Sequence, residues 1–422
     1  MKILNLSKFS CLSLLLVVVI SCKKPVNITG EISGASEVCY LEQGVEYSIE
    51  PSSAPDYILW VVPEQAEIIS GQGTARIKVN FGRKAGNVCV KFYKDDQEVI
   101  VPCFEVKFDR SGQWCRELDF PTGTRSNAFC FSIGSKGYIG MGISTTTLQE
   151  TDFWEFDPVE KVWTQKSVFP GLPRIAGVGF SIGSKGYVGT GQASNGVGPE
   201  SIYKDFWEYD PVLNQWSRKE DFIGLNRQYA FGFSIGNKGY IGGGNTSLLG
   251  NVKDFYEYDP ANGQWVKKDS FPEFRNGAAS FAIGNKAYVG TGGIGSLYFS
   301  DFYEFDPNDA SKGFDTNNNP LGKWSQKAQF PGSVRGFGVG FSLGNYGYMG
   351  LGAKTGGTDV YYNDFWKYTP DSGPGHWDSL PPLDRARGFG VGFSIANKGY
   401  IGIGNKGIAP TDQFKDFWVY TQ

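Results

Sequence analysis

Six arginines recur through the chain with the same neighbours at the same distances. Each is followed by a phenylalanine six residues on, a tyrosine thirteen residues on, and glycines fifteen and seventeen residues on. Guanidinium groups bind carboxylates in bidentate geometry, so six of them around one opening could bind an acidic ligand. The alternative is structural: each arginine pairs with an aspartate or with carbonyl groups of its own repeat. The arginines are Arg125, Arg174, Arg227, Arg275, Arg335 and Arg387.

Other residues offer little catalytic or metal chemistry. The one histidine, His376, is too few for the histidine ligands of a copper site. It lies in a turn before Trp377, which also argues against a histidine-based catalytic triad. The cysteines lack metal-ligand spacing. The insertion DPNDASKGFDTNNNPLGKW could bind calcium through oxygen atoms, but without the ordered spacing of a calcium loop it favours a solvated loop. We therefore expect no catalytic residue, no metal and no cofactor.

The arginines mark repeats about fifty residues long, a period typical of propeller blades. In RGFGVGFS, at Arg335 and again at Arg387, bulky residues alternate with glycine and serine, which predicts a strand packed closely on one face. A tight turn, a glycine-rich strand, an Asp-Phe-aromatic strand and a tryptophan strand complete each unit. The Asp-Phe steps begin at Asp152, Asp205, Asp254, Asp301, Asp364 and Asp416.

This pattern resembles kelch repeats, and six of them imply an all-β, six-bladed kelch-type β-propeller over residues 111–422. The sixth unit ends at Gln422 without its tryptophan strand, whereas Trp114 precedes the first arginine. We expect the strand around Trp114 to complete the last blade, because closure removes the exposed sheet edge.

Residues 23–110 read as short strands, and YILWVVPEQAEIISGQGTARIKVNFG resembles a PKD-like, immunoglobulin-type β-sandwich. Residues 1–22 have a basic start and an apolar core too short to span a bilayer. They end in Val-Ile-Ser-Cys, which resembles a lipobox, so we expect a signal peptide and lipidation of Cys22; the alternative is an ordinary secretory signal. Lys23, directly after this cysteine, favours the outer membrane. The sequence leaves open whether the protein faces the periplasm or the cell surface.

Five cysteines follow the anchor. Side-chain parity places Cys89 opposite Cys103 across a predicted hairpin, which predicts a disulfide. Cys130 stands where other repeats have glycine or serine, so a small buried filler is favoured over a reactive thiol. Cys39 and Cys115 have no assigned partner.

Near-neutral charge, with 40 basic and 43 acidic residues, gives no broad attraction to nucleic acid.

The variable loops are expected on the same side of the propeller as the arginines, and variable loops on a rigid scaffold usually carry the function. They are QASNGVGPESIYK, AKTGGTDVYYN and NKGIAPTDQFK. We expect a monomeric, non-enzymatic envelope lipoprotein that touches the membrane only through its lipid and binds a protein or glycan. Aromatic anchors on this face would be Tyr298, Phe299, Tyr361 and Tyr362.

The alternative is an enzyme that resembles the sialic acid mutarotases, which are also six-bladed kelch propellers. Such an enzyme needs positioned acids and bases, and an arginine for the sugar carboxylate. A deep polar pocket with convergent arginine and glutamate would favour the enzyme, and a plugged channel would favour the binding protein.

Overall fold

The computed structural model describes residues 26–39, 42–82, 84–108, 111–145, 150–193, 201–407 and 410–422. The signal segment with Cys22 and parts of three variable loops lie outside these residues. The described residues form two compact units, one within residues 1–36 and 42–107 and one within residues 37–41 and 108–422. The short segment 37–41 therefore belongs to the second unit, which differs from the sequence-based boundary at residue 110. Among the described residues, no helix is long and apolar enough to cross a membrane.

The first unit is a small β-sandwich of two sheets, with strand orders β1-β2-β5-β4 and β3-β6-β7, and β8 paired with β6. Trp60 lies in its core, 2 % exposed, and its indole nitrogen donates to the carbonyl of Thr74 at 2.8 Å. A disulfide joins Cys89 and Cys103. The strands are β1 (Ile32–Gly34), β2 (Val45–Ile49), β3 (Tyr57–Val61), β4 (Glu67–Ser70), β5 (Arg76–Asn80), β6 (Gly86–Lys94), β7 (Gln97–Ile100) and β8 (Phe104–Val106).

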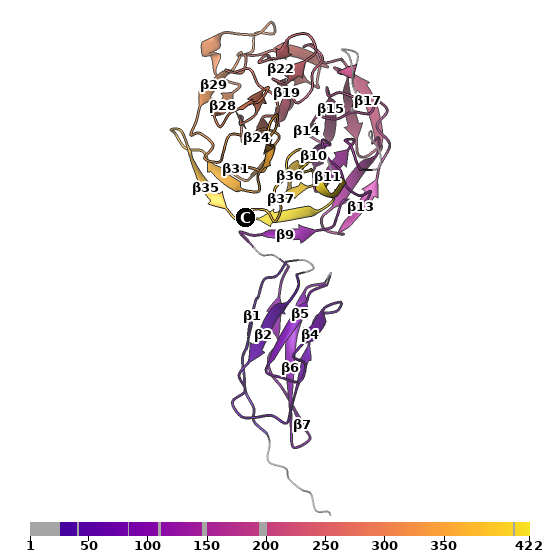
Figure 1. Cartoon of the computed structure of the whole chain (residues 1–422), viewed down its shortest axis with the longest axis vertical. Coiled ribbons are helices and arrows are strands. Elements are labelled where there is room, and N and C mark those ends of the chain that lie inside the picture. Colours follow the sequence, from indigo (N-terminus) through magenta and orange to yellow (C-terminus); the bar gives the residue numbers. More distant parts are fainter. Residues whose placement is uncertain are drawn as a thin grey trace, which may run out of the picture. The chain divides into compact units, whose positions relative to one another are not determined.

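The second unit consists of six four-stranded antiparallel sheets arranged around a centre (Figure 1). Blade 1 consists of β10 (Phe129–Ile133), β11 (Lys136–Gly140), β12 (Phe153–Asp157) and β13 (Val162–Gln165). Blade 2 consists of β14 (Val178–Ile182), β15 (Lys185–Gly189), β16 (Phe206–Asp210) and β17 (Gln215–Lys219). Blade 3 consists of β18 (Phe231–Ile235), β19 (Lys238–Gly242), β22 (Phe255–Asp259) and β23 (Gln264–Lys267). Blade 4 consists of β24 (Ala279–Ile283), β25 (Lys286–Gly290), β28 (Phe302–Asp306) and β29 (Lys323–Gln326). Blade 5 consists of β30 (Val339–Leu343), β31 (Tyr346–Gly350), β34 (Phe365–Thr369) and β35 (His376–Leu380). Blade 6 consists of β36 (Val391–Ile395), β37 (Lys398–Gly402), β38 (Phe417–Thr421) and β9 (Trp114–Glu117).

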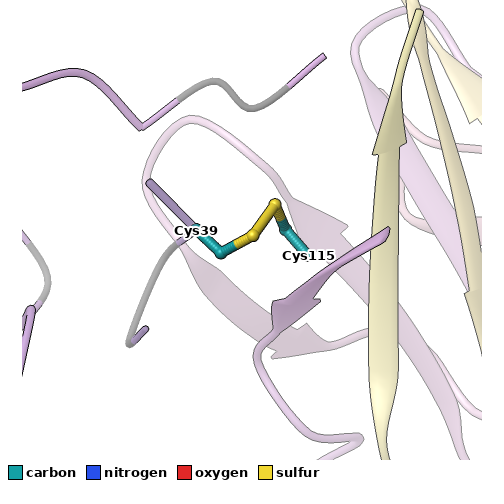
Figure 2. Close-up of a disulfide and its surroundings, with 2 residues drawn as sticks. All are labelled: Cys39 and Cys115. Carbon is teal, nitrogen blue, oxygen red and sulfur yellow. A yellow bond between two sulfur atoms is a disulfide. The ribbon is translucent and has the colours of Figure 1, made fainter. Parts of the chain in front are cut away.

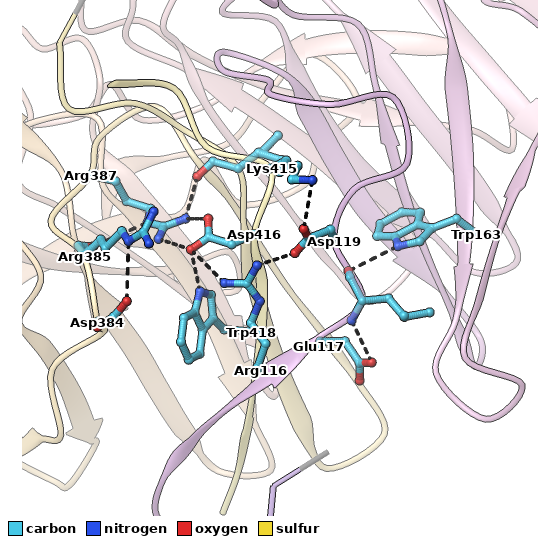
Figure 3. Close-up of polar contacts among 12 residues, drawn as sticks. Arg116, Glu117, Asp119, Trp163, Asp384, Arg385, Arg387, Lys415, Asp416 and Trp418 are labelled. Carbon is cyan, nitrogen blue, oxygen red and sulfur yellow. Dashed lines mark hydrogen bonds and ion pairs between the residues drawn. The ribbon is translucent and has the colours of Figure 1, made fainter. Parts of the chain in front are cut away.

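The ring closes through β9, which pairs antiparallel with β38 and places Trp418 opposite Arg116. The Trp114 indole donates to the carbonyl of Pro381 at 3.0 Å and packs edge-on against the ring of Phe365. Figure 3 shows Arg116 reaching from β9 toward Asp119 and the Trp418 strand. Hydrogen bonds, aromatic packing and ion pairs thus join the first strand of the unit to the last.

Close packing between blades explains a glycine in the second strand of most blades. A Cβ on Gly186 would lie 2.3 Å from the ring of Phe131 in the preceding blade, and a Cβ on Gly239 would lie 2.4 Å from Phe180. Any larger side chain would push this phenylalanine out of the interface. The alternation of phenylalanine and glycine read from the sequence therefore sets the spacing between blades, and the all-β fold class is confirmed.

Candidate functional site

The six arginines are buried, between 0 and 2 % exposed. Arg227 shows the arrangement: its two terminal nitrogens donate to the two carboxylate oxygens of Asp254 at 2.7 and 2.9 Å. One of them also donates to the carbonyl of Gly243 at 2.9 Å, and the guanidinium lies 4.7 Å from the ring centre of Phe222. The other five make the same bidentate pair within their own blades, with Asp152, Asp205, Asp301, Asp364 and Asp416.

This geometry corrects the anion-ring interpretation. Because the guanidinium groups are covered and already bind aspartates, they are not presented to a ligand. Their role is to hold the Asp-Phe step of each blade against the loop that precedes its first strand. The carboxyl of Asp254 illustrates the electrostatics: burial raises its pKa, but the hydrogen bonds and charge of Arg227 outweigh burial and hold the pKa below its usual range.

The proposed aromatic anchors mostly support this scaffold as well. Phe299 and Tyr362 lie over the guanidiniums of Arg275 and Arg335, with ring centres 4.7 and 3.9 Å away. Tyr298 is 6 % exposed and its hydroxyl lies 2.8 Å from that of Thr355. Tyr361 alone of the four remains half-buried without such a contact among those described. The structure does not gather these four rings into a platform for a sugar.

Two positions after each arginine, the backbone forms a closed ring that the sequence did not reveal. Each of these six residues donates its N–H to the carbonyl of the matching residue in the preceding blade, at 2.8–3.3 Å. All six have φ between 52° and 63°, although five are not glycine. Left-handed backbone costs such residues about 1–2 kcal/mol each. The residues are Asn127, Ala176, Tyr229, Gly277, Phe337 and Phe389.

The aromatic members of this ring narrow the central channel. Phe337 and Phe389 stack with ring centres 4.4 Å apart, and Tyr229 meets Phe337 edge-on at 5.1 Å. They line a cavity of about 160 Å³ at the level of the ring. A second cavity of about 210 Å³ is lined by the inner strands, including Cys130 and Ser280.

The described lining of these two cavities holds no carboxylate, ammonium, guanidinium or imidazole. Its two titratable groups are far from neutral pH: burial raises the pKa of the Tyr229 hydroxyl and that of the Cys130 thiol each to about 12. General acid–base catalysis works best with a group that titrates near the working pH. The channel therefore offers a narrow, uncharged opening rather than an acid–base site.

The loop face of blades 3, 4 and 5 carries three short hairpins, β20–β21 (Asn245–Thr246, Gly250–Asn251), β26–β27 (Gly293–Ile294, Leu297–Tyr298) and β32–β33 (Ala353–Lys354, Val360–Tyr361). The side chain of Asn276 donates to Asn251 at 2.6 Å, and Tyr298 contacts Thr355, so neighbouring blades brace each hairpin. We call the exposed aliphatic residues in or next to their turns the hairpin ridge: Leu248 (75 % exposed), Leu249 (65 %), Ile294 (37 %), Leu297 (61 %) and Val360 (41 %).

The Asp/Asn-rich insertion of blade 4 braces the opposite side of the propeller. Asp315 pairs with Lys268 at 3.0 Å, both side chains 2 % exposed, and accepts backbone N–H groups of Asn317 and Asn319. Its carboxylate is therefore occupied by contacts within the propeller. Among the described residues, no group of three or more acidic, cysteine or histidine side chains is arranged to bind a metal.

Comparison with known proteins agrees with the two units. The model of the PKD-like domain family matches residues 24–94. A solved structure titled "Structure of YjhT", a kelch-type propeller, superposes with a TM-score of 0.60 at 20 % sequence identity and covers 72 % of this chain and 97 % of that chain. At this identity the likeness shows the fold alone. The comparison with curated proteins gave no match.

Proposed function

We propose that this protein is a lipid-anchored protein of the bacterial cell envelope that binds another protein through the hairpin ridge. The observation that carries the proposal is the exposure of five aliphatic side chains on three adjacent, braced hairpins. Exposed apolar side chains gathered in one region mark interaction sites, because a soluble surface otherwise scatters them singly. The kelch-type fold is compatible with such a binding role.

The chemistry of the ridge favours a protein over a glycan. Sugars are bound by flat aromatic faces together with polar side chains. Here Phe299 and Tyr362 already cover arginines, and the exposed residues are leucine, isoleucine and valine. Aliphatic side chains instead fill complementary pockets on a protein partner, and they exclude water around the contact.

The narrow, uncharged channel argues against the mutarotase alternative. Tyr229, Phe337 and Phe389 narrow its centre, and the arginines that would receive a sugar carboxylate are buried against aspartates. For the envelope location, the support is the pair of disulfides, Cys89–Cys103 and Cys39–Cys115, because such bonds persist in oxidising compartments. The anchor itself rests on the lipobox that ends at Cys22.

The test compares two aspartate variants of the full-length protein after mild cross-linking in the native cells. Leu297→Asp lies on the ridge, 61 % exposed; Leu213→Asp lies in the turn between β16 and β17 on the other face, 63 % exposed. We expect wild type and Leu213→Asp to retain a stoichiometric protein partner and Leu297→Asp to lose it. Equal capture by both variants would contradict the ridge. Acceleration of N-acetylneuraminic acid mutarotation by wild type, followed by NMR, would instead support the enzyme.

A further inference from the structure

A cavity of about 440 Å³ lies within the second unit between blades 6 and 1, at the strand turns on the side opposite the hairpin ridge. Blade 6 contributes residues of β36, β37, β38 and β9, and blade 1 contributes the β12–β13 turn. Figure 2 shows the disulfide between Cys39 and Cys115 of β9, and both cysteines line the cavity. The volume falls within the range of about 300–1,000 Å³ that small-molecule sites occupy.

The lining of this cavity suits an uncharged molecule. Aliphatic and aromatic side chains surround the disulfide: Val38, Phe108, Val159, Ile395 and Val419. Two lysines also line the cavity, and both are engaged within the protein. Lys161 pairs with the buried Glu117, and Lys398 likewise has a partner. Neither ammonium group therefore calls for an anionic ligand.

Tyr400 brings to this lining a hydroxyl that has no acceptor. In blades 1 to 4 the tyrosine of the second strand donates to a glutamate of the third strand, as Tyr187 does to Glu208 at 2.6 Å. In blade 6 Val419 stands opposite Tyr400 and offers no acceptor. Tyr400 is 2 % exposed, and no described residue accepts a hydrogen bond from its hydroxyl. A buried donor left in this state costs free energy, which an acceptor on a ligand would recover.

Blade 5 provides a matched case in which the same hydroxyl is sealed. There Lys367 stands opposite Tyr348, whose hydroxyl is buried and also has no hydrogen-bond partner among the described residues. The ring of Tyr348 is 0 % exposed and packs against Tyr420 of blade 6, with ring centres 5.7 Å apart. The hydroxyl of Tyr348 is thus closed off by packing, whereas Tyr400 adjoins a cavity that a ligand could fill.

We propose that this cavity binds a neutral, mostly apolar molecule with one hydrogen-bond-accepting oxygen, such as a medium-chain ketone or ester. The hydrocarbon part gains free energy by leaving water for the apolar lining. The oxygen accepts the hydrogen bond of Tyr400 and so satisfies the buried donor. Burial, and in addition the negative charge of Glu117, raises the pKa of the Tyr400 hydroxyl, which therefore stays protonated and donates at neutral pH.

The test uses residues 23–422, which contain every described residue, and titration calorimetry with methyl heptyl ketone. Tyr400→Phe removes the hydroxyl at the cavity, and Tyr348→Phe removes the sealed hydroxyl of blade 5. Neither hydroxyl has a hydrogen-bond partner among the described residues, so both variants should fold as wild type. We expect one saturable site in wild type, unchanged in Tyr348→Phe and about tenfold weaker in Tyr400→Phe, a factor that corresponds to about 1.4 kcal/mol.

The place of the site and its preference for an uncharged ligand are tested separately. Val159→Asp borders the cavity, and Val212→Asp occupies the matching turn of blade 2; both positions are exposed, and we expect only Val159→Asp to weaken the ketone, about fivefold. Nonanoate should bind wild type about tenfold more weakly than the ketone, because its carboxylate would lose water without gaining a free cation. Absence of saturable ketone binding, equal affinity of the two phenylalanine variants, equal affinity of the two aspartate variants, or equal affinity for nonanoate would each overturn the proposal.

Discussion

Removal of a single guanidinium should destabilise the propeller without any ligand present. In Arg227→Ala, the carboxylate of Asp254 loses a bidentate partner, and the carbonyl of Gly243 loses a donor. Breaking a buried ion pair by removing one partner costs about 3–5 kcal/mol. Because the Asp254 side chain is 23 % exposed, water recovers part of this loss, and we expect about 3 kcal/mol.

The opposite variant, Asp254→Ala, should cost more, since it leaves the guanidinium of Arg227 charged and 0 % exposed. We expect about 4–5 kcal/mol for this change. The double variant should cost less than the sum of the two single variants by about 2 kcal/mol, because the pair is then absent as a whole. This non-additivity identifies the pair itself as the source of the stability.

The assay is differential scanning calorimetry of residues 23–422, in which the propeller transition is followed. At about 2 °C per kcal/mol for a unit of this size, Arg227→Ala should melt about 6 °C below wild type. A melting temperature within 1 °C of wild type would refute the reasoning, as would strict additivity of the two single variants. Added sialic acid should leave the melting temperatures of wild type and Arg227→Ala unchanged, because no guanidinium of the described residues lines the channel.

Three further predictions concern the closure, the acid response and the anchor. Deletion of residues 113–118 should remove β9 and lower propeller stability by about 3–5 kcal/mol, as measured by urea unfolding, because the half-buried Trp114 and the pairing of β9 with β38 are both lost. Because Arg227 holds the folded-state pKa of Asp254 below its unfolded value near 4, their pairing stabilises the fold above about pH 4 and is lost as the pH falls through the folded pKa. Melting temperatures should therefore hold from pH 7 to 5 and fall below pH 4, less so in Asp254→Ala. Cys22→Ala should move the protein from the membrane to the soluble fraction, and retention of the cleaved variant in membranes would contradict the anchor.

The blades could be predicted from the sequence because their packing requires the same residue types in every copy. A glycine that admits Phe131 or Phe180 of the preceding blade must recur at a fixed offset, and so must the tryptophan of the fourth strand. The missing sixth tryptophan strand pointed to Trp114, and β9 indeed pairs with β38. Such requirements are local to the repeat, so the chain displays the tryptophan in all six blades and the glycine in five, with Ala287 in its place in blade 4.

The features that the sequence did not reveal depend on contacts rather than on residue type. The backbone ring two positions after each arginine contains asparagine, alanine, tyrosine, glycine and phenylalanine, so no shared side chain marks it. Cys39 lies within the sequence range of the sandwich, but its segment belongs to the propeller unit, where it meets Cys115 seventy-six residues away. Phe299 and Tyr362 were expected to bind a ligand because they are aromatic residues in variable loops, but their rings lie over the guanidiniums of Arg275 and Arg335.

In a repeat fold, the copies that depart from the common pattern are better guides to function than the residues that all copies share. Every blade has its arginine, and all six arginines are buried in ion pairs within the propeller. The hairpin ridge exists because the loops of blades 3, 4 and 5 carry aliphatic tips. Substitution of Leu297 should therefore alter binding with little change in stability, whereas substitution of Arg227 should do the reverse.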